Sequence, residues 1–152
     1  MPVKEVVFTI KLPISSVWSF MNDRPEVGCL FPGCKGVTIL NELDSIWQIK
    51  MSLGPFTRTI EMHAHTTEML ENQRLAWTAT HEHLITSGIT IFRKISNDET
   101  EITYRLEGHV TGRLGFLQEI IVAEKLGEVT RSFMKNIKER LEYRADNEAK
   151  GS

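Results

Sequence analysis

The segment that decides the fold is GRLGFLQEIIVAEKLGEVTRSFMKNIKERLEY, residues 112–143. Its apolar residues recur mainly at intervals of three and four, at Leu117, Ile121, Val122, Leu126, Val129, Phe133, Ile137 and Leu141. Charged residues such as Arg131, Lys135 and Glu139 occupy the opposite side. This period predicts one amphipathic helix of about thirty residues, whose apolar face must be covered by another layer of the protein.

Alternation between apolar and polar residues marks the strands that precede this helix. In the first strand, residues 3–12, the even-numbered side chains form a mostly apolar face. Pro13 ends that strand, because proline cannot donate a hydrogen bond to a ladder. The same alternation predicts six further antiparallel strands, at residues 37–43, 46–53, 56–68, 74–82, 85–95 and 101–110.

Two short helices are expected between the first and second strands. Ser15 or Ser16 is the expected cap of the first helix, and Asp23 is the expected cap of the second, whose first turn holds Pro25. A curved antiparallel sheet cannot fill its own concave side, so we expect the long helix to lie across it. If the short helices close one end, a mostly apolar space remains between sheet and helix.

Length and composition limit the classes of function. With 152 residues and a mass of 17.4 kDa, the chain fits one domain, expected at residues 1–143 with a polar tail at 144–152. The net charge of −2 gives no electrostatic reason to bind nucleic acid in bulk. No apolar run approaches the roughly 20 residues of a membrane span, and residues 1–11 lack a signal peptide's apolar region. With only two cysteines and therefore no disulfide framework, we expect a cytoplasmic protein.

Several short motifs carry a family resemblance. They are Pro-Ile-Ser-Ser-Val-Trp at 13–18, Asn22-Asp23 with Pro25, Cys-Leu-Phe-Pro-Gly-Cys at 29–34, Gly54-Pro55, and Gly112 with Gly115. With the order of elements, they resemble the SRPBCC superfamily, which includes START lipid-transfer domains, birch-pollen-allergen relatives and polyketide cyclases. More narrowly, they resemble the carbon monoxide dehydrogenase CoxG family. The resemblance implies an α+β helix-grip fold: a curved seven-stranded antiparallel sheet wrapped around a long C-terminal helix, with two short helices after the first strand.

Five histidines raise the question of a metal site, but their positions argue against one. His63 and His65 fall on the outer face of the strand at 56–68. Folding that strand back about Glu71 would place His63 near Thr78 rather than near His81. We see no zinc-type cluster of histidines and cysteines, so we expect no metal ion and no cofactor, and we interpret this face as solvated.

Cys29 and Cys34 stand on either side of Pro32-Gly33. As metal ligands they lack partners, and as a redox pair they lack the Cys-x-x-Cys spacing. Free cysteine is among the most buried residue types, so we interpret both thiols as structural. The Pro-Gly turn is expected to shape the mouth of the apolar space.

Aromatic and apolar side chains on the expected inner faces are the candidate ligand-binding residues. They are Trp18, Phe31, Trp47, Met51, Phe56, Arg58, Ile60, Met62, Trp77, His81, Tyr104, Ile121, Val129 and Phe133. The aromatic members fit a flat or greasy ligand, and they fit a plain core equally well. Arg58 and His81 are polar exceptions that would either meet a polar group of a ligand or reach solvent at a strand end.

Three functions are compatible with these patterns. We favour a non-catalytic module that binds a small hydrophobic ligand in the cavity between sheet and helix, as a carrier or as an accessory protein of the CoxG type. The resemblance implies a larger redox enzyme of the molybdenum hydroxylase type as the partner. The first alternative is an enzyme like polyketide cyclases or dehydratases, in which Arg58, His81 and Tyr104 orient or protonate the substrate. The second is a docking module for a redox enzyme, with a homodimer among its forms.

Overall fold

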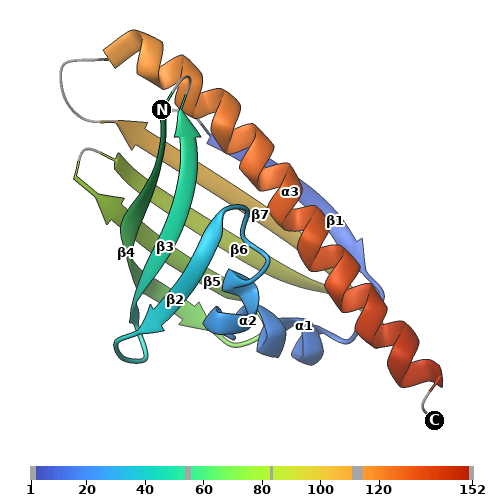
Figure 1. The fold of residues 1–152 in the computed structure, drawn as a ribbon. Helices are drawn as coiled ribbons and strands as arrows, with labels where there is room; N and C mark the ends of the chain where they lie inside the picture. The colour runs from blue at the N-terminus through green and yellow to red at the C-terminus, as the bar shows by residue number, and fades with distance from the viewer. Residues whose placement is uncertain (1–2, 54–55, 83, 111–114, 151–152) are drawn as a thin grey trace.

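The computed structural model describes residues 3–53, 56–82, 84–110 and 115–150. One seven-stranded antiparallel sheet runs in the order β1-β7-β6-β5-β4-β3-β2. The elements are β1 (Val3–Ile10), α1 (Ile14–Met21), α2 (Arg24–Gly28), β2 (Cys34–Ile39), β3 (Asp44–Leu53), β4 (Phe56–Leu70), β5 (Arg74–His81), β6 (Leu84–Ser96), β7 (Glu99–Val110) and α3 (Gly115–Lys150). Figure 1 shows α3 lying diagonally across one face of the curved sheet, with α1 and α2 near one end. The expected helix-grip fold is confirmed.

The two short helices begin differently, because α2 has a side-chain cap and α1 has none. Asp23 caps α2 as predicted, because its Oδ1 accepts a hydrogen bond from the Glu26 amide at 3.2 Å. The predicted serine cap of α1 is wrong. Pro13 holds the cap position with an extended backbone and no side-chain cap, so Ser15 and Ser16 lie inside the helix.

The second strand begins and ends earlier than the sequence predicts. It lies at Cys34–Ile39 rather than 37–43, because Asn41 forms the turn that follows it. The Asn41 Oδ1 accepts hydrogen bonds from the amides of Leu43 and Asp44, each at 2.9 Å.

The hairpin between β4 and β5 turns at residues 71–73, as the sequence predicts, but the strands do not fold about Glu71. Leu70 pairs with Arg74, so the turn centres on Asn72, which has φ 60, rather than on Glu71. A bulge between Thr66 and Glu68 then adds one unpaired residue to β4.

These two features change the neighbour of the first histidine on β4. His63 lies opposite Thr80, and His65 lies opposite Thr78, so the predicted pairing of His63 with Thr78 is wrong. Both histidines are nevertheless exposed on the outer face, as the strand alternation predicts.

The long helix carries the expected buried stripe and runs further than expected. Leu126, Phe133, Ile137 and Leu141 are each at most 8% exposed and pack into one cluster with residues of β1, β7 and α1. The helix continues to Lys150 rather than ending near Tyr143. No helix in the described part of the chain is long and apolar enough to cross a membrane.

The C-terminal part of α3 is tied to the short helices. Arg140 Nη1 and Arg144 Nη2 lie 2.7 Å and 2.6 Å from the same oxygen of Glu26 on α2. The Arg144 guanidinium also stacks 5.1 Å from the centre of the Phe20 ring on α1. These contacts fix α1 and α2 against α3 and close that end of the fold.

We expect the variant Glu26→Gln to lower the free energy of unfolding by about 1 kcal/mol, because it removes the charge that two arginines share. The measurement is urea denaturation at low salt, followed by circular dichroism. Glu139→Gln is the matched control, since Glu139 is 64% exposed and lies 3.9 Å from Lys135 Nζ. Equal denaturation midpoints for the two variants would contradict the importance of this contact.

Candidate functional site

Two buried apolar clusters meet on the concave face of the sheet. The helix-side cluster holds the α3 stripe together with residues of α1, β1 and β7. The strand-side cluster consists of Ile49, Ile60, Met62 and Ala79, from β3, β4 and β5. Phe31, Trp47 and Trp77 are only partly buried, and each packs against both clusters. These three aromatic side chains therefore mark the boundary between the clusters.

Ring contacts connect the two sides of the concave face. Phe31 lies edge-on to Trp47 of β3 at 6.0 Å between centroids, and edge-on to Phe133 of α3 at 5.0 Å. Phe133 in turn lies edge-on to Tyr104 of β7 at 5.7 Å. Such edge-to-face pairs are favourable beyond the area that they bury. A chain of four rings thus runs from β3 across the Phe31 loop, residues 30–33 between α2 and β2, to α3 and on to β7.

The loop that carries Phe31 is held from both sides. Asn136 Nδ2 of α3 donates to the Leu30 carbonyl at 2.9 Å, and the Lys50 amide of β3 donates to the Gly33 carbonyl at 2.8 Å. Gly33 has φ +81, and a Cβ there would overlap the Lys50 carbonyl. The Pro-Gly turn therefore needs glycine at this position to bring the loop against the sheet.

Trp77 lies flat against the neighbouring strand. Gly88 of β6 stands opposite Trp77 in the ladder, and a Cβ on Gly88 would overlap the indole ring. The missing side chain at Gly88 therefore makes the room that Trp77 occupies on the concave face.

The other predicted ligand-binding residues lie in either of the two clusters, on α3, or outside the described side chains. Ile60 and Met62 are 7% and 5% exposed in the strand-side cluster, and Val129 is half-buried on α3. Trp18 lies in the helix-side cluster, 8% exposed, with its ring edge-on to Phe92 at 5.2 Å. The side chains of Met51, Phe56, Arg58 and Ile121 lie outside the described part of the structure.

The structure does not bring His81 and Tyr104 together. His81 pairs with Leu84, whereas Tyr104 pairs with Thr90 further along β6. At about 3.4 Å per residue, this separation is roughly 20 Å. The His81 Nδ1 donates to the Glu61 carbonyl at 2.9 Å, since a carbonyl oxygen can only accept. One small substrate could not contact both side chains.

Two buried hydroxyl groups lack hydrogen-bond partners among the described residues. They are Tyr104 Oη on β7 and Thr130 Oγ1 on α3, and each residue is 1% exposed. Burial raises the pKa of Tyr104, so its phenol stays protonated and acts as a hydrogen-bond donor. An unmade hydrogen bond of a buried group costs about 1–3 kcal/mol, so both hydroxyls are unfavourable for a plain core.

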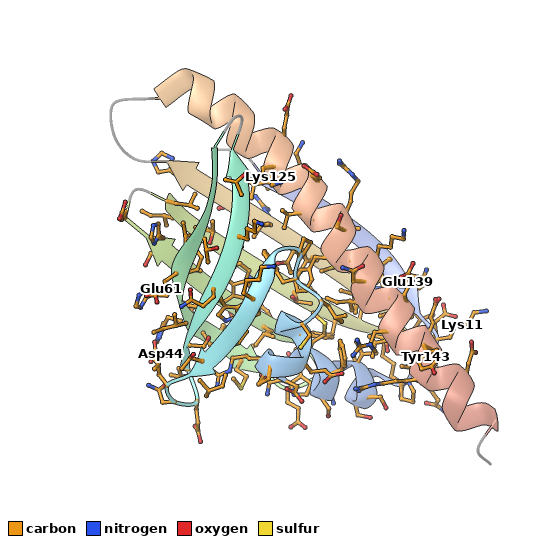
Figure 2. The ribbon with its side chains drawn as sticks, viewed as in Figure 1. Lys11, Asp44, Glu61, Lys125, Glu139 and Tyr143 are labelled. Carbon is orange, nitrogen blue, oxygen red and sulfur yellow. The ribbon has the colours of Figure 1, made fainter. Side chains whose placement is uncertain are left out.

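Polar groups gather on the outer face without a metal-binding set. His65 Nδ1 lies 2.8 Å from Asp44 Oδ1, and the hydrogen bond holds the pKa of Asp44 below its usual value. A surface hollow of about 400 Å³ lies beside this pair, lined by His63, Thr78 and Thr80 among others. Glu61 also points outward from β4 (Figure 2). The described residues contain no group of three side chains suited to hold a metal ion.

Both cysteines border the Phe31 loop as free thiols. Cys29 is exposed, whereas Cys34 is half-buried and its Sγ contacts the Gly36 carbonyl at 3.6 Å. Burial raises the pKa of the Cys34 thiol. The two thiols therefore differ in access, and burial makes the Cys34 thiol harder to ionise than an ordinary thiol.

We expect iodoacetamide at pH 8 to alkylate Cys29 several-fold faster than Cys34, because the thiolate is the reacting species. Timed quenching and mass spectrometry of the two cysteine peptides measure both rates in one sample. The unfolded protein in urea is the control, in which the rates should become similar. Faster reaction at Cys34 would show that the loop is open in solution.

We expect Tyr104→Phe to raise the free energy of unfolding by about 1 kcal/mol, because it removes a buried hydroxyl without a partner. The matched control is Tyr143→Phe, since Tyr143 is 65% exposed, and its effect should stay within about 0.5 kcal/mol. Both are measured by urea denaturation. A clear loss of stability for Tyr104→Phe would mean that the hydroxyl has a partner in solution.

Solved structures share this architecture at low sequence identity. A conserved protein from Geobacillus kaustophilus superposes with a TM-score of 0.78 and 14% identity, over 91% of this chain and 94% of that one. A START superfamily protein from Mycobacterium smegmatis gives 0.76 and 13%, over 93% and 97% of the two chains. The Zhui aromatase/cyclase from Streptomyces sp. R1128 gives 0.72 and 14%, over 94% of each chain. At this identity the likeness establishes the fold alone.

The sequence itself identifies a narrower group. A comparison with curated proteins found no match. Residues 7–142, from within β1 to within α3, match one protein family. This span includes the Phe31 loop, all seven strands at least in part and the α3 stripe. The chain belongs to the carbon monoxide dehydrogenase CoxG family.

Proposed function

We propose that this protein binds a small hydrophobic ligand between the concave face of the sheet and α3. The observation that carries the proposal is the position of Phe31, Trp47 and Trp77, which stay partly exposed between two buried clusters. Large aromatic side chains gain most from being covered. An apolar molecule seated among them would remove that remaining surface from water, at about 25 cal/mol per Å².

The covering loop suits a site that must admit a ligand. Phe31 is the only ring in the four-ring chain that does not come from a helix or strand. Short loops move more readily than the packed elements that they join. Movement of the loop would open a route between β3 and α3 without separating the sheet from the helix.

The family name suggests where such a ligand would be used. The CoxG family is named for carbon monoxide dehydrogenase, which is a redox enzyme. We therefore propose a non-catalytic carrier or accessory role beside a redox enzyme of the molybdenum hydroxylase type. The distance between His81 and Tyr104 favours this role over a cyclase-like enzyme that uses both residues.

We expect the purified protein to bind the neutral probe N-phenyl-1-naphthylamine at one saturable site, with a rise in probe fluorescence. Ala64→Leu should weaken binding about tenfold, because Ala64 packs against the strand-side cluster, as Trp47 does, and the added side chain would occupy the site. His63→Leu adds a similar apolar side chain to the adjacent, exposed position and should leave the affinity unchanged.

Equal affinities of the two variants would argue that the probe binds elsewhere on the surface. Failure of the unmodified protein to bind would overturn the proposal, unless native mass spectrometry shows that a copurified ligand already fills the site. Denaturing extraction of such a ligand would then give its chemical class directly.

A further inference from the structure

Two cationic side chains meet where α3 packs against β1. Gly127 is a buried position on α3, and a Cβ added to it would lie 3.2 Å from Arg131 Nη1 and 3.4 Å from Lys4 Cε. Lys4 belongs to the inner face of β1, because it pairs with the buried Leu106 of β7. The missing side chain of Gly127 therefore lets both cationic side chains cover the same point of the helix.

Neither of these two positive charges is balanced within the fold. The exposed side chains of Lys4 and Arg131 make no ion pair or hydrogen bond with the part of the chain that the structure describes. Glu128, the residue after Gly127, lies 3.7 Å from Lys125 Nζ instead. Two positive charges near one point repel each other, because salt screens charges only beyond about 8 Å. An anionic group placed between them would remove that repulsion.

The strand beside this pair has a free edge. β1 is the last strand of the sheet, and Figure 1 shows it at the margin of the fold next to α3. Half of the backbone amide and carbonyl groups of an edge strand point away from its single neighbour, so they can pair with an added strand. On its outer face β1 also exposes two apolar side chains, Val3 at 37% and Val7 at 55%.

The two faces of β1 restrict the sequence of a strand that could be added there. Side chains of a strand alternate between the faces of the sheet, and each lies beside the neighbouring strand's residue on the same face. On the inner face, acidic side chains would meet Lys4 and Arg131. On the outer face, apolar side chains would cover Val3 and Val7, whereas acidic ones would meet the exposed Glu5 between them.

We infer that the free edge of β1 binds an extended segment of another protein in which acidic and apolar side chains alternate, and that Lys4 and Arg131 bind its acidic side chains. This interaction goes beyond ligand binding and does not depend on it. A lysine on the inner side of an edge strand opposes the addition of a neutral or basic strand. A second copy of β1 is disfavoured for the same reason, because it brings another Lys4.

The probe that tests the inference is a fluorescein-labelled peptide of four Val-Glu repeats. Its matched control has four valines followed by four glutamates, which keeps the composition and charge but removes the alternation. Dissociation constants for the full chain are measured by fluorescence anisotropy at low salt. We expect the alternating peptide to bind about tenfold more tightly than the control. Hydrogen exchange should slow at the amides of β1 and stay unchanged at β2, the opposite edge of the sheet.

Two pairs of substitutions assign the binding to the cationic pair. Lys4→Gln and Arg131→Gln should each weaken binding of the alternating peptide about threefold, and together about tenfold, because single exposed ion pairs are weak. The control combines Lys35→Gln with Lys135→Gln, which removes two exposed positive charges from β2 and from another side of α3. This control should leave the affinity unchanged. Thermal unfolding establishes that all variants are folded.

The outcomes distinguish this edge from a general attraction to acidic molecules. Equal affinities for the two peptides, or equal effects of the two double variants, would overturn the inference, because binding would then follow net charge alone. Absence of peptide binding would overturn it as well. Binding of phosphatidylglycerol vesicles that depends on Lys4 and Arg131 would in that case assign the pair to a lipid headgroup. None of these results bears on the hydrophobic ligand, which the naphthylamine probe tests separately.

Discussion

The packing of α3 on β1 and β7 is the contact on which the rest of the structure depends. The buried stripe of α3 covers that half of the concave face, and α3 touches β3 much less extensively. The half formed by β3, β4 and β5 therefore has its own small cluster and needs another cover. Because the sheet curves away from a straight helix, the incomplete cover follows from geometry rather than from any single residue.

The Phe31 loop supplies that second cover, and its anchors explain why the short helices matter. The loop is bonded to α3 through Asn136 and to β3 through Lys50, while Glu26 on the preceding helix binds Arg140 and Arg144. These contacts lie on one stretch of chain that follows α1. The N-terminal helices and the far end of α3 therefore set the position of a ring in the middle of the site.

Periodicity in the sequence predicts most of this architecture. The alternation places Tyr104 and Met62 inward and His63 outward, and the period of three and four places Phe133 on the sheet side of α3; the structure confirms each of these. Three features of the structure could not be predicted from such patterns. The bulge at Thr66–Glu68 changes the pairing of β4 with β5 without a signal in the sequence, and the contact of Arg144 with Glu26 joins residues that no spacing connects. Thr130 escaped because an apolar stripe is defined by its apolar members, although its position between Leu126 and Phe133 was visible in the sequence.

The hydroxyl groups of Thr130 and Tyr104 lower the stability of the core, because both are buried without a hydrogen-bond partner among the described residues. Valine and phenylalanine would fill nearly the same volumes without a hydroxyl to satisfy, so packing alone gives no reason for either polar group. Local rules of this kind are broken most often at functional sites. The conflict lies at the β7 end of the four-ring chain, in the half of the concave face that α3 covers. Incomplete cover and unsatisfied hydroxyls are independent properties, one of backbone geometry and one of side-chain chemistry, and the ring contacts of Phe133 connect the two regions in which they occur.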